Sequence, residues 1–435
     1  MKKEMALDQI LQLLRMRGVI STGELTRELG VNRSTLTRRL KGVMPDIVRI
    51  GNTRKSSLGL LRTIPTLGNE VPLFRINQNG QMTPQGKLLI FHPRQYIVWP
   101  KTEIFNALPP EISDMAPQGF MGRALVRRHA LELNLPERLQ NWSDDHVLIF
   151  ISKRGEDLPG NLIVGTESAR RWMNTKTTST NRRSYPDLAN LALEGQPVGS
   201  SAGGEQPKFS AFVDGKYKII KFSPHSNSPI DKRWRDLLIC EHISLGCLQQ
   251  LGVEACKTSL HETKAFTFLE ADRFDRIGLR GRRSVLSLSA VDGFLFGGRD
   301  SWSATAQRLE RSHLISSDEV RKIKKLEAYC ILTGDTDRHF YNLALFPKTN
   351  SEGGFELKRF ELAPAFDKLP MFFAPTERRI LDREFPTPIP NSEIIEVWNE
   401  VTDLAMEFWC HVSKDLRISA NFRQIAKTCL KKLMR

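Results

Sequence analysis

The segment TGDTDRHFYNLALF, residues 333–346, is dense in groups that could do chemistry. It places Asp335, Asp337 and Asn342 within eight positions and then continues into an apolar, strand-like run. In protein-kinase sites a carboxylate receives the proton of the acceptor hydroxyl, and an Asn five residues later binds a metal ion. Asp337 and Asn342 have this separation. The segment therefore indicates a catalytic loop, with an ordinary solvated turn as the alternative.

Such a site also needs an acidic second metal ligand and a lysine that holds the α- and β-phosphates of ATP. Asp367 lies 25 residues after Asn342, in ELAPAFDKLPMF, behind a Pro-containing apolar turn. Lys221 directly follows two isoleucines in YKIIKFSP, a predicted strand. Each residue alone would usually be a solvated side chain. Their order along the chain predicts phosphoryl transfer from ATP with Mg²⁺.

Two other functions remain open from the residues alone. Asp335 and Asp337 could form a D-x-D metal pair for nucleic-acid cleavage, which a basic chain would suit, but the spacing of Asn342 and Asp367 would then be accidental. The chain could also be a DNA-binding transcriptional regulator with a degenerate kinase-like module. The complete set of Lys221, Asp337, Asn342 and Asp367 argues against that alternative, because an inactive site has no physical need of all four.

The charge of the chain is uneven. Lys and Arg number 64 against 49 Asp and Glu, a net charge of +15 in 435 residues, and residues 1–62 carry +8 of it. Such a basic segment favours nucleic acid as a partner. The six cysteines form no C-x-x-C pair, which favours reduced thiols over a zinc site or disulfides. With no apolar run of membrane-spanning length and no signal-peptide core, we expect a cytoplasmic protein without a membrane partner.

The basic N-terminal segment has the pattern of three short helices. Apolar residues recur at helical spacing before Gly18, Ser21 and Glu24 have the spacing of a capping box, and a third helix starts from Asn32. Two β-rich runs around the basic turn GNTRKS follow as a candidate wing. The pattern predicts a helix-turn-helix domain, with a small helical subdomain of solvated charge as the alternative. The candidate DNA-binding residues are Arg33, Ser34, Thr35, Thr37, Arg38 and Arg39 on the third helix and Arg54 and Lys55 in the turn.

The remaining chain divides by pattern. From about residue 71 short strands are expected, joined by Asn-Gly and Pro-Gln-Gly turns, and 170–201 is expected to be an exposed loop. VDGK predicts a hairpin turn, and helices dominate after residue 231. We therefore predict an α+β protein with a winged helix-turn-helix domain at 1–65, a β-rich small lobe at 70–270 and an α-helical large lobe at 271–435, the layout of protein-kinase-like folds.

Five motifs together resemble the HipA family of serine/threonine kinase toxins. They are SAGGEQPKF, IIKF, DRFDR, GDTDRHFYN and LAPAFD, and the resemblance covers nearly everything from about residue 71 to the C-terminus. With its helix-turn-helix head, the chain is most similar to stand-alone enterobacterial members. The resemblance implies a toxin that inhibits growth by phosphorylating a cellular protein with ATP and Mg²⁺. It also implies autophosphorylation and, as partners, an unidentified protein substrate and an antitoxin. The family usually relies on a separate DNA-binding antitoxin, whereas the pattern of this chain predicts DNA binding through its own residues 1–62.

The same resemblance implies roles residue by residue. Tyr341 stands where the family commonly has Lys, so the substrate-facing surface differs and the family's best-known target class, an aminoacyl-tRNA synthetase, is not transferred. The implied roles are Asp337 as catalytic residue; Asn342 and Asp367 as magnesium ligands; Lys221, with Glu241 as its pairing partner, and Asn342 for ATP; Asp272 and Phe274 for adenine; Gly203 and Gly204 in a phosphate loop; and Ser201 or its neighbour Ser200 as the autophosphorylated serine.

Overall fold

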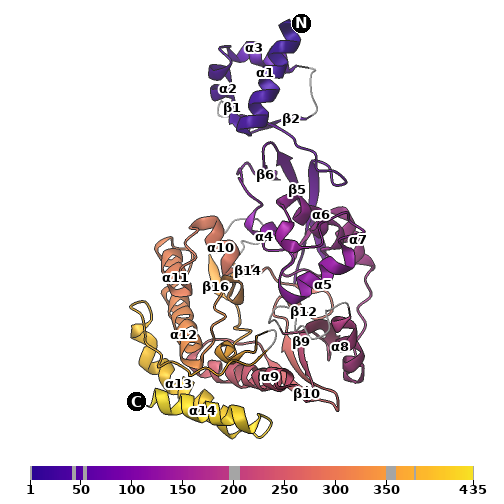
Figure 1. Cartoon of the computed structure of the whole chain (residues 1–435). Coiled ribbons are helices and arrows are strands. Elements are labelled where there is room, and N and C mark those ends of the chain that lie inside the picture. The colour runs from indigo at the N-terminus through magenta and orange to yellow at the C-terminus, as the bar shows by residue number, and fades with distance from the viewer. Residues whose placement is uncertain are drawn as a thin grey trace.

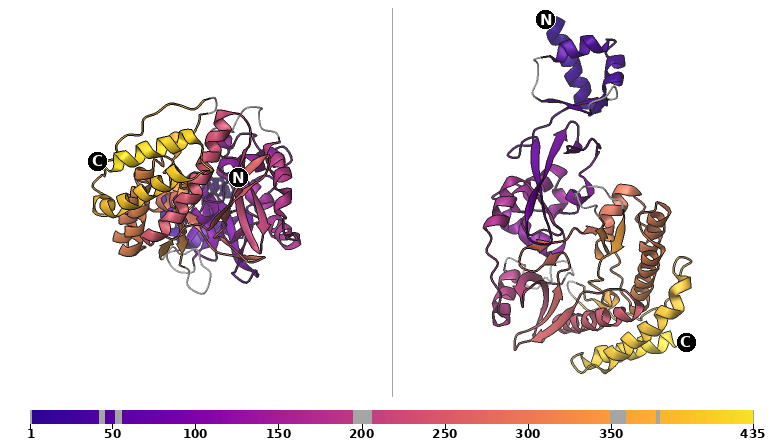
Figure 2. Two further views of the ribbon diagram at one scale, coloured as in Figure 1. Left: turned by 90° about the horizontal axis from the view of Figure 1, so that it is seen from below. Right: turned by 180° about the vertical axis from the view of Figure 1, so that it is seen from behind.

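A computed structural model describes residues 2–41, 46–51, 56–194, 206–348, 359–376 and 379–434. The molecule is elongated: the N-terminal head stands at one end, and the last two helices lie at the other (Figures 1 and 2). Predictions that fall outside the described residues stay predictions; they concern Arg54, Lys55, Ser200, Ser201, Gly203 and Gly204. Among the described helices, none combines the length and apolarity needed to cross a bilayer.

The head forms the predicted elements for local reasons. Ser21 caps the second helix by accepting from the backbone of Glu24, whose carboxylate accepts in return from the Ser21 backbone, so the capping box is confirmed. Asn32 caps the third helix, and its side chain accepts from Thr35 at 2.8 Å. The strands form an antiparallel sheet in the order β1-β3-β2. The bounds are α1 Lys2–Arg17, β1 Ile20–Ser21, α2 Thr22–Glu28, α3 Arg33–Leu40, β2 Ile47–Ile50 and β3 Ser57–Leu60.

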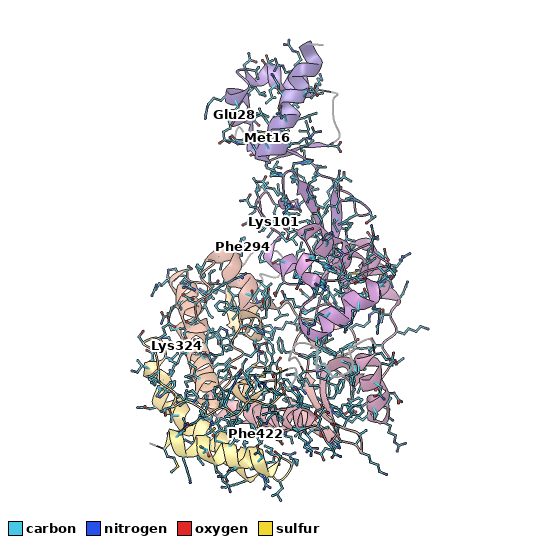
Figure 3. The ribbon with its side chains drawn as sticks, in the orientation of Figure 1. Met16, Glu28, Lys101, Phe294, Lys324 and Phe422 are labelled. Carbon is cyan, nitrogen blue, oxygen red and sulfur yellow. The ribbon has the colours of Figure 1, made fainter. Side chains whose placement is uncertain are left out.

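The head shares an apolar core with the unit that follows it. One cluster joins Ile50 and Leu61 to Leu89, Phe91 and Ile97, and Leu61 pairs with Phe91 in an antiparallel bridge. The backbone N–H of Arg62 donates to the carbonyl of Ile90 at 2.8 Å. Figure 3 labels two residues near this joint, Met16 on the head and Lys101 beyond it. The head is thus packed directly against the unit that follows it and is not joined to it by a linker alone.

The middle unit is a four-stranded sheet in the order β6-β5-β4-β7, covered by helices. The predicted Pro-Gln-Gly turn is wrong, because Pro84 and Gly86 lie inside β5. The register between β4 and β5 shifts there, and β6 pairs β5 only from Lys87 onward, so Pro84 needs no partner on that side. The bounds are β4 Glu70–Ile76, β5 Met82–Phe91, β6 Gln95–Trp99, α4 Pro110–Ser113, α5 Gly119–His129, α6 Asp144–Arg154, β7 Leu162–Val164 and α7 Thr166–Asn174.

A second four-stranded sheet, in the order β10-β11-β9-β8, carries the predicted hairpin, whose turn holds Asp214 and Gly215 at positive φ. The loop expected at 170–201 is wrong where α7 and α8 form, and its residues 195–201 lie outside the described part of the chain. α7 runs into this segment and α8 lies within it, because Tyr185 and Ala189 are fully buried against the sheet. The bounds are α8 Tyr185–Leu193, β8 Lys208–Val213, β9 Lys216–Pro224, β10 Thr258–Glu262 and β11 Phe266–Asp272.

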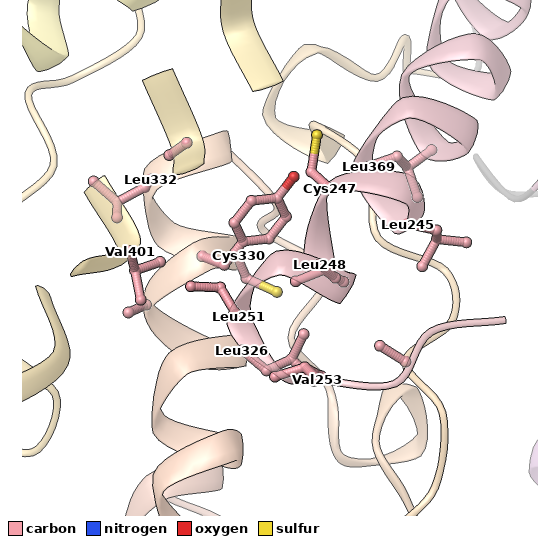
Figure 4. Packing of buried hydrophobic residues seen from close by; sticks show 14 of the residues in the cluster. Leu245, Cys247, Leu248, Leu251, Val253, Leu326, Cys330, Leu332, Leu369 and Val401 are labelled. Atoms are coloured by element: carbon pink, nitrogen blue, oxygen red, sulfur yellow. The ribbon is translucent and has the colours of Figure 1, made fainter. Parts of the chain in front are cut away.

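The largest core lies in the helical part of the chain. Figure 4 shows residues of α9 and the turn after it packed on Leu326, Cys330 and Leu332 of α12 and Val401 of α13. This core fixes both ends of the segment that the sequence singled out. The bounds are α9 Pro229–Leu248, β12 Arg276–Ile277, β13 Gly281–Arg282, β14 Leu286–Ser287, α10 Leu288–Leu295, α11 Trp302–Arg311, α12 Ser317–Thr333, β15 Ala344–Pro347, β16 Phe360–Leu362, α13 Ile395–Lys414 and α14 Ala420–Leu433.

Candidate active site

Lys221 points away from the core that holds its neighbours. On β9, Ile220 and Phe222 join the apolar cluster beneath α8, so the alternation of the strand places Lys221 on the opposite face. There its Nζ meets Glu241 of α9, with both carboxylate oxygens at 2.7 Å. It also contacts Oδ1 of Asp367. The predicted lysine therefore forms a buried cluster with two carboxylates.

The charged groups in this cluster shift one another's pKa values. Burial disfavours the charged form of Lys221, but Asp367 and Glu241 outweigh it and raise the pKa of the ammonium. Burial alone would raise the pKa of the Asp367 carboxyl. The positive charges of Lys221 and then of Lys208 outweigh burial and hold this pKa well below the usual range. For Glu241, burial prevails over Lys221 and raises the pKa. At neutral pH the site therefore presents an ammonium beside an ionised Asp367.

The candidate catalytic loop starts where α12 ends. Gly334 caps the helix at φ 75°, and the backbone N–H of Asp335 returns to the carbonyl of Cys330 at 2.8 Å. The Asp335 side chain is fully buried, and its Oδ1 accepts from the backbone N–H of Asp337 at 3.0 Å. Burial raises the pKa of Asp335 to about 6, against the opposing charge of Lys368. Asp335 thus shapes the loop from inside.

Asp337 and Asn342 meet as their spacing predicted. Nδ2 of Asn342 donates to the carbonyl oxygen of Asp337 at 2.9 Å and to its Oδ2 at 3.2 Å. Asn342 is buried, whereas the Asp337 side chain is 43 % exposed. Because the amide nitrogen makes these contacts, the amide oxygen is the atom that could bind a metal ion. The carboxylate of Asp337 is thus open to solvent on one side.

The Asp367 segment closes the site. Asp367 adopts φ 57°, a left-handed conformation that Asp tolerates better than most residues. The next residue, Lys368, is 1 % exposed and donates from Nζ to the carbonyl oxygen of Asn342 at 3.0 Å. Contacts therefore run without a break from Glu241 and Lys221 through Asp367 and its neighbour to Asn342 and Asp337. The structure brings together five of the predicted residues.

The remaining predicted residues lie at or away from this cluster. The ring of Phe274 packs 5.6 Å from that of Phe366, beside Asp367. The Asp272 carboxylate instead binds Lys216 at 2.6 Å, where the central strands β11 and β9 end and begin. The described candidates for DNA binding lie on α3, in the head, and the phosphate-loop glycines and serines lie outside the described residues.

Two lysines of the site were missed in the sequence. Lys208 pairs with Lys221 across β8 and β9, and its charge acts on Asp367. It stands in the EQPKF part of a motif, so counting strand positions from the hairpin turn could have found it. Lys368 carried no such signal, because its neighbours in the sequence do not indicate that it is buried.

Comparison with known proteins assigns the chain to a family. Residues 67–173 match the family model "YjjJ-like toxin, middle domain", and residues 200–433 match "HipA-like C-terminal domain". The chain is 31 % identical over 441 residues to Toxin YjjJ of Escherichia coli (strain K12), which covers 97 % of this chain and 96 % of that protein. The chain belongs to the HipA-like toxin family. The resemblance seen in the motifs is thereby confirmed, and it includes the similarity to a YjjJ-like member.

Two solved structures are similar to this HipA-like chain. One is HipA of Shewanella oneidensis MR-1, in a complex with HipB and operator DNA, at 15 % identity and a TM-score of 0.46 over 75 % of this chain and 84 % of that one. The other is the Helicobacter pylori proinflammatory kinase CtkA, at 14 % identity and a TM-score of 0.36 over 53 % of this chain and 91 % of that one.

Replacing Glu241 by Gln tests the buried cluster of this HipA-like chain. Removing one partner of a buried ion pair leaves the other poorly compensated, so the free energy of unfolding should fall by about 3 kcal/mol, the lower end of the usual cost because Asp367 still faces Lys221. Urea unfolding measures this change. The control is Glu384→Gln, at an exposed carboxylate that binds Lys432 at 2.6 Å, and it should leave stability unchanged. Equal losses in both variants would contradict the assignment.

Proposed function

We propose that the chain is an ATP- and Mg²⁺-dependent serine/threonine protein kinase whose activity makes it a toxin. The observation that carries the proposal is the unbroken set of contacts from Glu241 and Lys221 through Asp367 and the adjacent Lys368 to Asn342 and Asp337. Membership of the HipA-like toxin family supports it. These residue types supply a phosphate-binding cation, metal ligands and a base.

The donor set fits ATP and Mg²⁺. Lys221 stays protonated, because two carboxylates raise its pKa, and would hold the α- and β-phosphates. Asp367 stays ionised and, with the amide oxygen of Asn342, offers the oxygen ligands that Mg²⁺ prefers. When bound, Mg²⁺ neutralises charge that develops on the phosphate oxygens. Phe274, packed beside Asp367, is proposed to contact adenine, and Asp272 would mark the edge of that pocket.

Asp337 is proposed to orient the acceptor hydroxyl and take its proton. Its carboxylate is half exposed, and its Oδ2 accepts a hydrogen bond from the buried Asn342. A serine or threonine side chain could therefore approach the carboxylate from solvent. As the hydroxyl oxygen bonds to the γ-phosphorus, the bond from that phosphorus to the β,γ-bridging oxygen breaks. ADP leaves, and the hydroxyl proton passes to Asp337.

The buried position of Asp335 favours the kinase over a nuclease. A D-x-D metal pair would need both carboxylates to face one ion, but Asp335 is fully buried and bonded to the loop backbone, whereas Asp337 faces solvent. The regulator alternative is disfavoured by the tight packing of the whole kinase set. A regulator would have no use for a paired Lys221 or a protected Asn342.

One reaction tests the proposed kinase. The purified chain is incubated with γ-labelled ATP and Mg²⁺ together with a bacterial lysate, and labelled proteins are mapped by mass spectrometry. Transfer to serine or threonine is expected, including Ser201 or Ser200, where a phosphate beside Gly203 and Gly204 would repel the phosphates of ATP. If no protein is labelled while the chain stays folded, the kinase proposal fails. An antitoxin stays a proposed partner on the ground of family membership alone.

The head is proposed to bind duplex DNA through α3. On its surface Arg33 and Arg38 are exposed and Arg39 is half-buried. Replacing all three by Gln in the full-length chain should weaken binding to a mixed-sequence duplex and lower the slope of log K against log salt by about 2 to 3, because fewer counterions are released. Fluorescence anisotropy over a salt series measures both effects.

The control for the head changes Lys427 and Lys431 to Gln. Both lie exposed on α14, at the opposite end of the molecule (Figure 1). Loss of their charges should leave the salt slope nearly unchanged. An unchanged slope in the α3 variant, or an equal change in the control, would mean that the basic charge of the head serves solubility alone.

A further inference from the structure

Lys368 is a buried lysine at a position where the proposed mechanism does not need one. It is among the largest fully buried side chains, at 1 % exposure, and no carboxylate of the described residues forms an ion pair with it. A buried ammonium without a direct counter-ion is costly, so its surroundings must compensate for the lost hydration. Its burial directly after Asp367 therefore requires an explanation.

The surroundings of Lys368 compensate for part of that cost. Its Nζ lies 4.8 Å from the ring centre of Trp302 and 5.8 Å from that of Phe366, distances at which aromatic rings attract a cation. One of its three N–H groups donates to the carbonyl oxygen of Asn342 at 3.0 Å. The aromatic rings hold the charge in place, and the hydrogen bond directs it to the catalytic loop.

Asp335 is the second group on which Lys368 acts. Burial raises the pKa of its carboxyl against the positive charge of Lys368 and the nearby Cys330 thiol, and its Oδ2 makes no well-formed hydrogen bond in the described part of the chain. Two N–H groups of the ammonium remain beyond the bond to Asn342. These N–H groups are hydrogen-bonding capacity that the contact with Asn342 does not use.

The hydrogen bond of Lys368 to Asn342 and its charge interaction with Asp335 involve the two ends of the catalytic loop. Asn342 stands at the end of the loop, and Asp335 stands at its start and holds the backbone N–H of Asp337 at 3.0 Å. The main chain of Lys368 continues directly from Asp367. One side chain therefore connects the segment that carries the acidic metal ligand to both ends of the loop that carries Asp337.

We propose that Lys368 is a positioning residue that fixes the catalytic loop, through Asn342 and Asp335, relative to Asp367. The inference rests on the proposed kinase for its consequence in activity, but not for the contacts themselves. Without the Lys368 side chain, the two proposed ligands of Mg²⁺, Asn342 and Asp367, would no longer be held at a fixed separation. The lysine that holds the ATP phosphates, Lys221, would keep its contact with Glu241.

The kinetic test uses Lys368→Met, which keeps the length and apolar stem of the side chain but removes its charge and N–H groups. The concentration of Mg²⁺ that gives half-maximal phosphoryl transfer should rise by about tenfold or more, as for other residues that orient metal ligands. The KM for ATP at saturating Mg²⁺ should change little. A rise in both constants by the same factor, or in neither, would overturn the positioning role.

The matched control is Lys324→Met. Lys324, labelled in Figure 3, is also a largely buried lysine, at 9 % exposure, but it lies on α12 and binds Glu396 at 2.9 Å. It should leave both constants unchanged even where it lowers stability. If it raises the requirement for Mg²⁺ as Lys368→Met does, the effect is a general result of losing a buried lysine.

A stability test is independent of kinase activity. Lys368→Met and Asp335→Asn should each lower Tm by about 5 °C, because each leaves the other charge buried alone. The double variant should lose clearly less than the sum, since it removes both charges together. Additive losses would refute the link to Asp335 even in an active kinase. If the losses of Tm are strongly non-additive in a chain that has no kinase activity, the positioning role of Lys368 is supported while the proposed function fails.

Discussion

Replacing Asp337 by Asn should lower phosphoryl transfer by about 10³-fold or more, because the acceptor hydroxyl loses both its proton acceptor and an oriented charge. The substitution keeps the size of the side chain, so the contact with the amide nitrogen of Asn342 can persist and the fold should remain intact. Growth inhibition on overexpression should disappear with the activity. Turnover of labelled ATP and a growth curve measure the two effects.

The control for this change is Asp318→Asn. Asp318 lies 72 % exposed on α12, the helix that leads into the catalytic loop, and binds Lys322 at 2.7 Å. Its loss should affect neither activity nor growth inhibition. If the Asp337 variant is inactive in transfer but still toxic, toxicity comes from another part of the chain, and the head becomes the first candidate.

Asp367→Asn should have an effect of similar size for a different reason. Asn is the other residue that readily adopts the left-handed conformation found here, so the backbone should not suffer. The change removes a negative charge that Mg²⁺ would need, and transfer should fall by about 10³-fold even with excess Mg²⁺. Steady-state rates over a series of Mg²⁺ concentrations measure the loss.

A closely matched control exists for Asp367. Asp214 also has a left-handed backbone, at φ 51°, in the turn between β8 and β9, where it binds Arg182 at 2.6 Å. Asp214→Asn should retain full activity. If excess Mg²⁺ restores the Asp367 variant to the rate of this control, the carboxylate contributes affinity for the ion but no part of the reaction itself.

Features whose interacting residues lie close together in the sequence could be predicted. The capping residues Ser21 and Asn32 act within their own helices, so their patterns could be read without tertiary information. The spacing of Asp337 and Asn342 works in the same way, since five residues across one tight loop determine where both side chains lie. Lys221 was predicted from its place directly after two isoleucines in a predicted strand, and the alternation of that strand explains why it faces away from Ile220.

Features that depend on distant partners could not be predicted. α8 forms because Tyr185 and Ala189 are covered by a sheet whose strands come later in the chain. Pro84 resembles a turn residue, and its place within β5 depends on how far β6 pairs alongside. Lys368 resembles a surface lysine, because its partner Asn342 lies 26 residues earlier and its aromatic neighbour Trp302 earlier still.

The apolar cluster between the head and the middle unit makes the joint stiff. Rotating the head as a rigid body would expose Ile50, Leu61 and Phe91 to water together, so the two units should unfold in one transition, and a fragment cut at residue 65 would tend to self-associate. A stiff joint also fixes the orientation of α3 relative to the rest of the chain. A partner bound to α3 would therefore have a fixed orientation relative to the loop that carries Asp337, and a force that turned the head would pass to the middle unit through this apolar cluster.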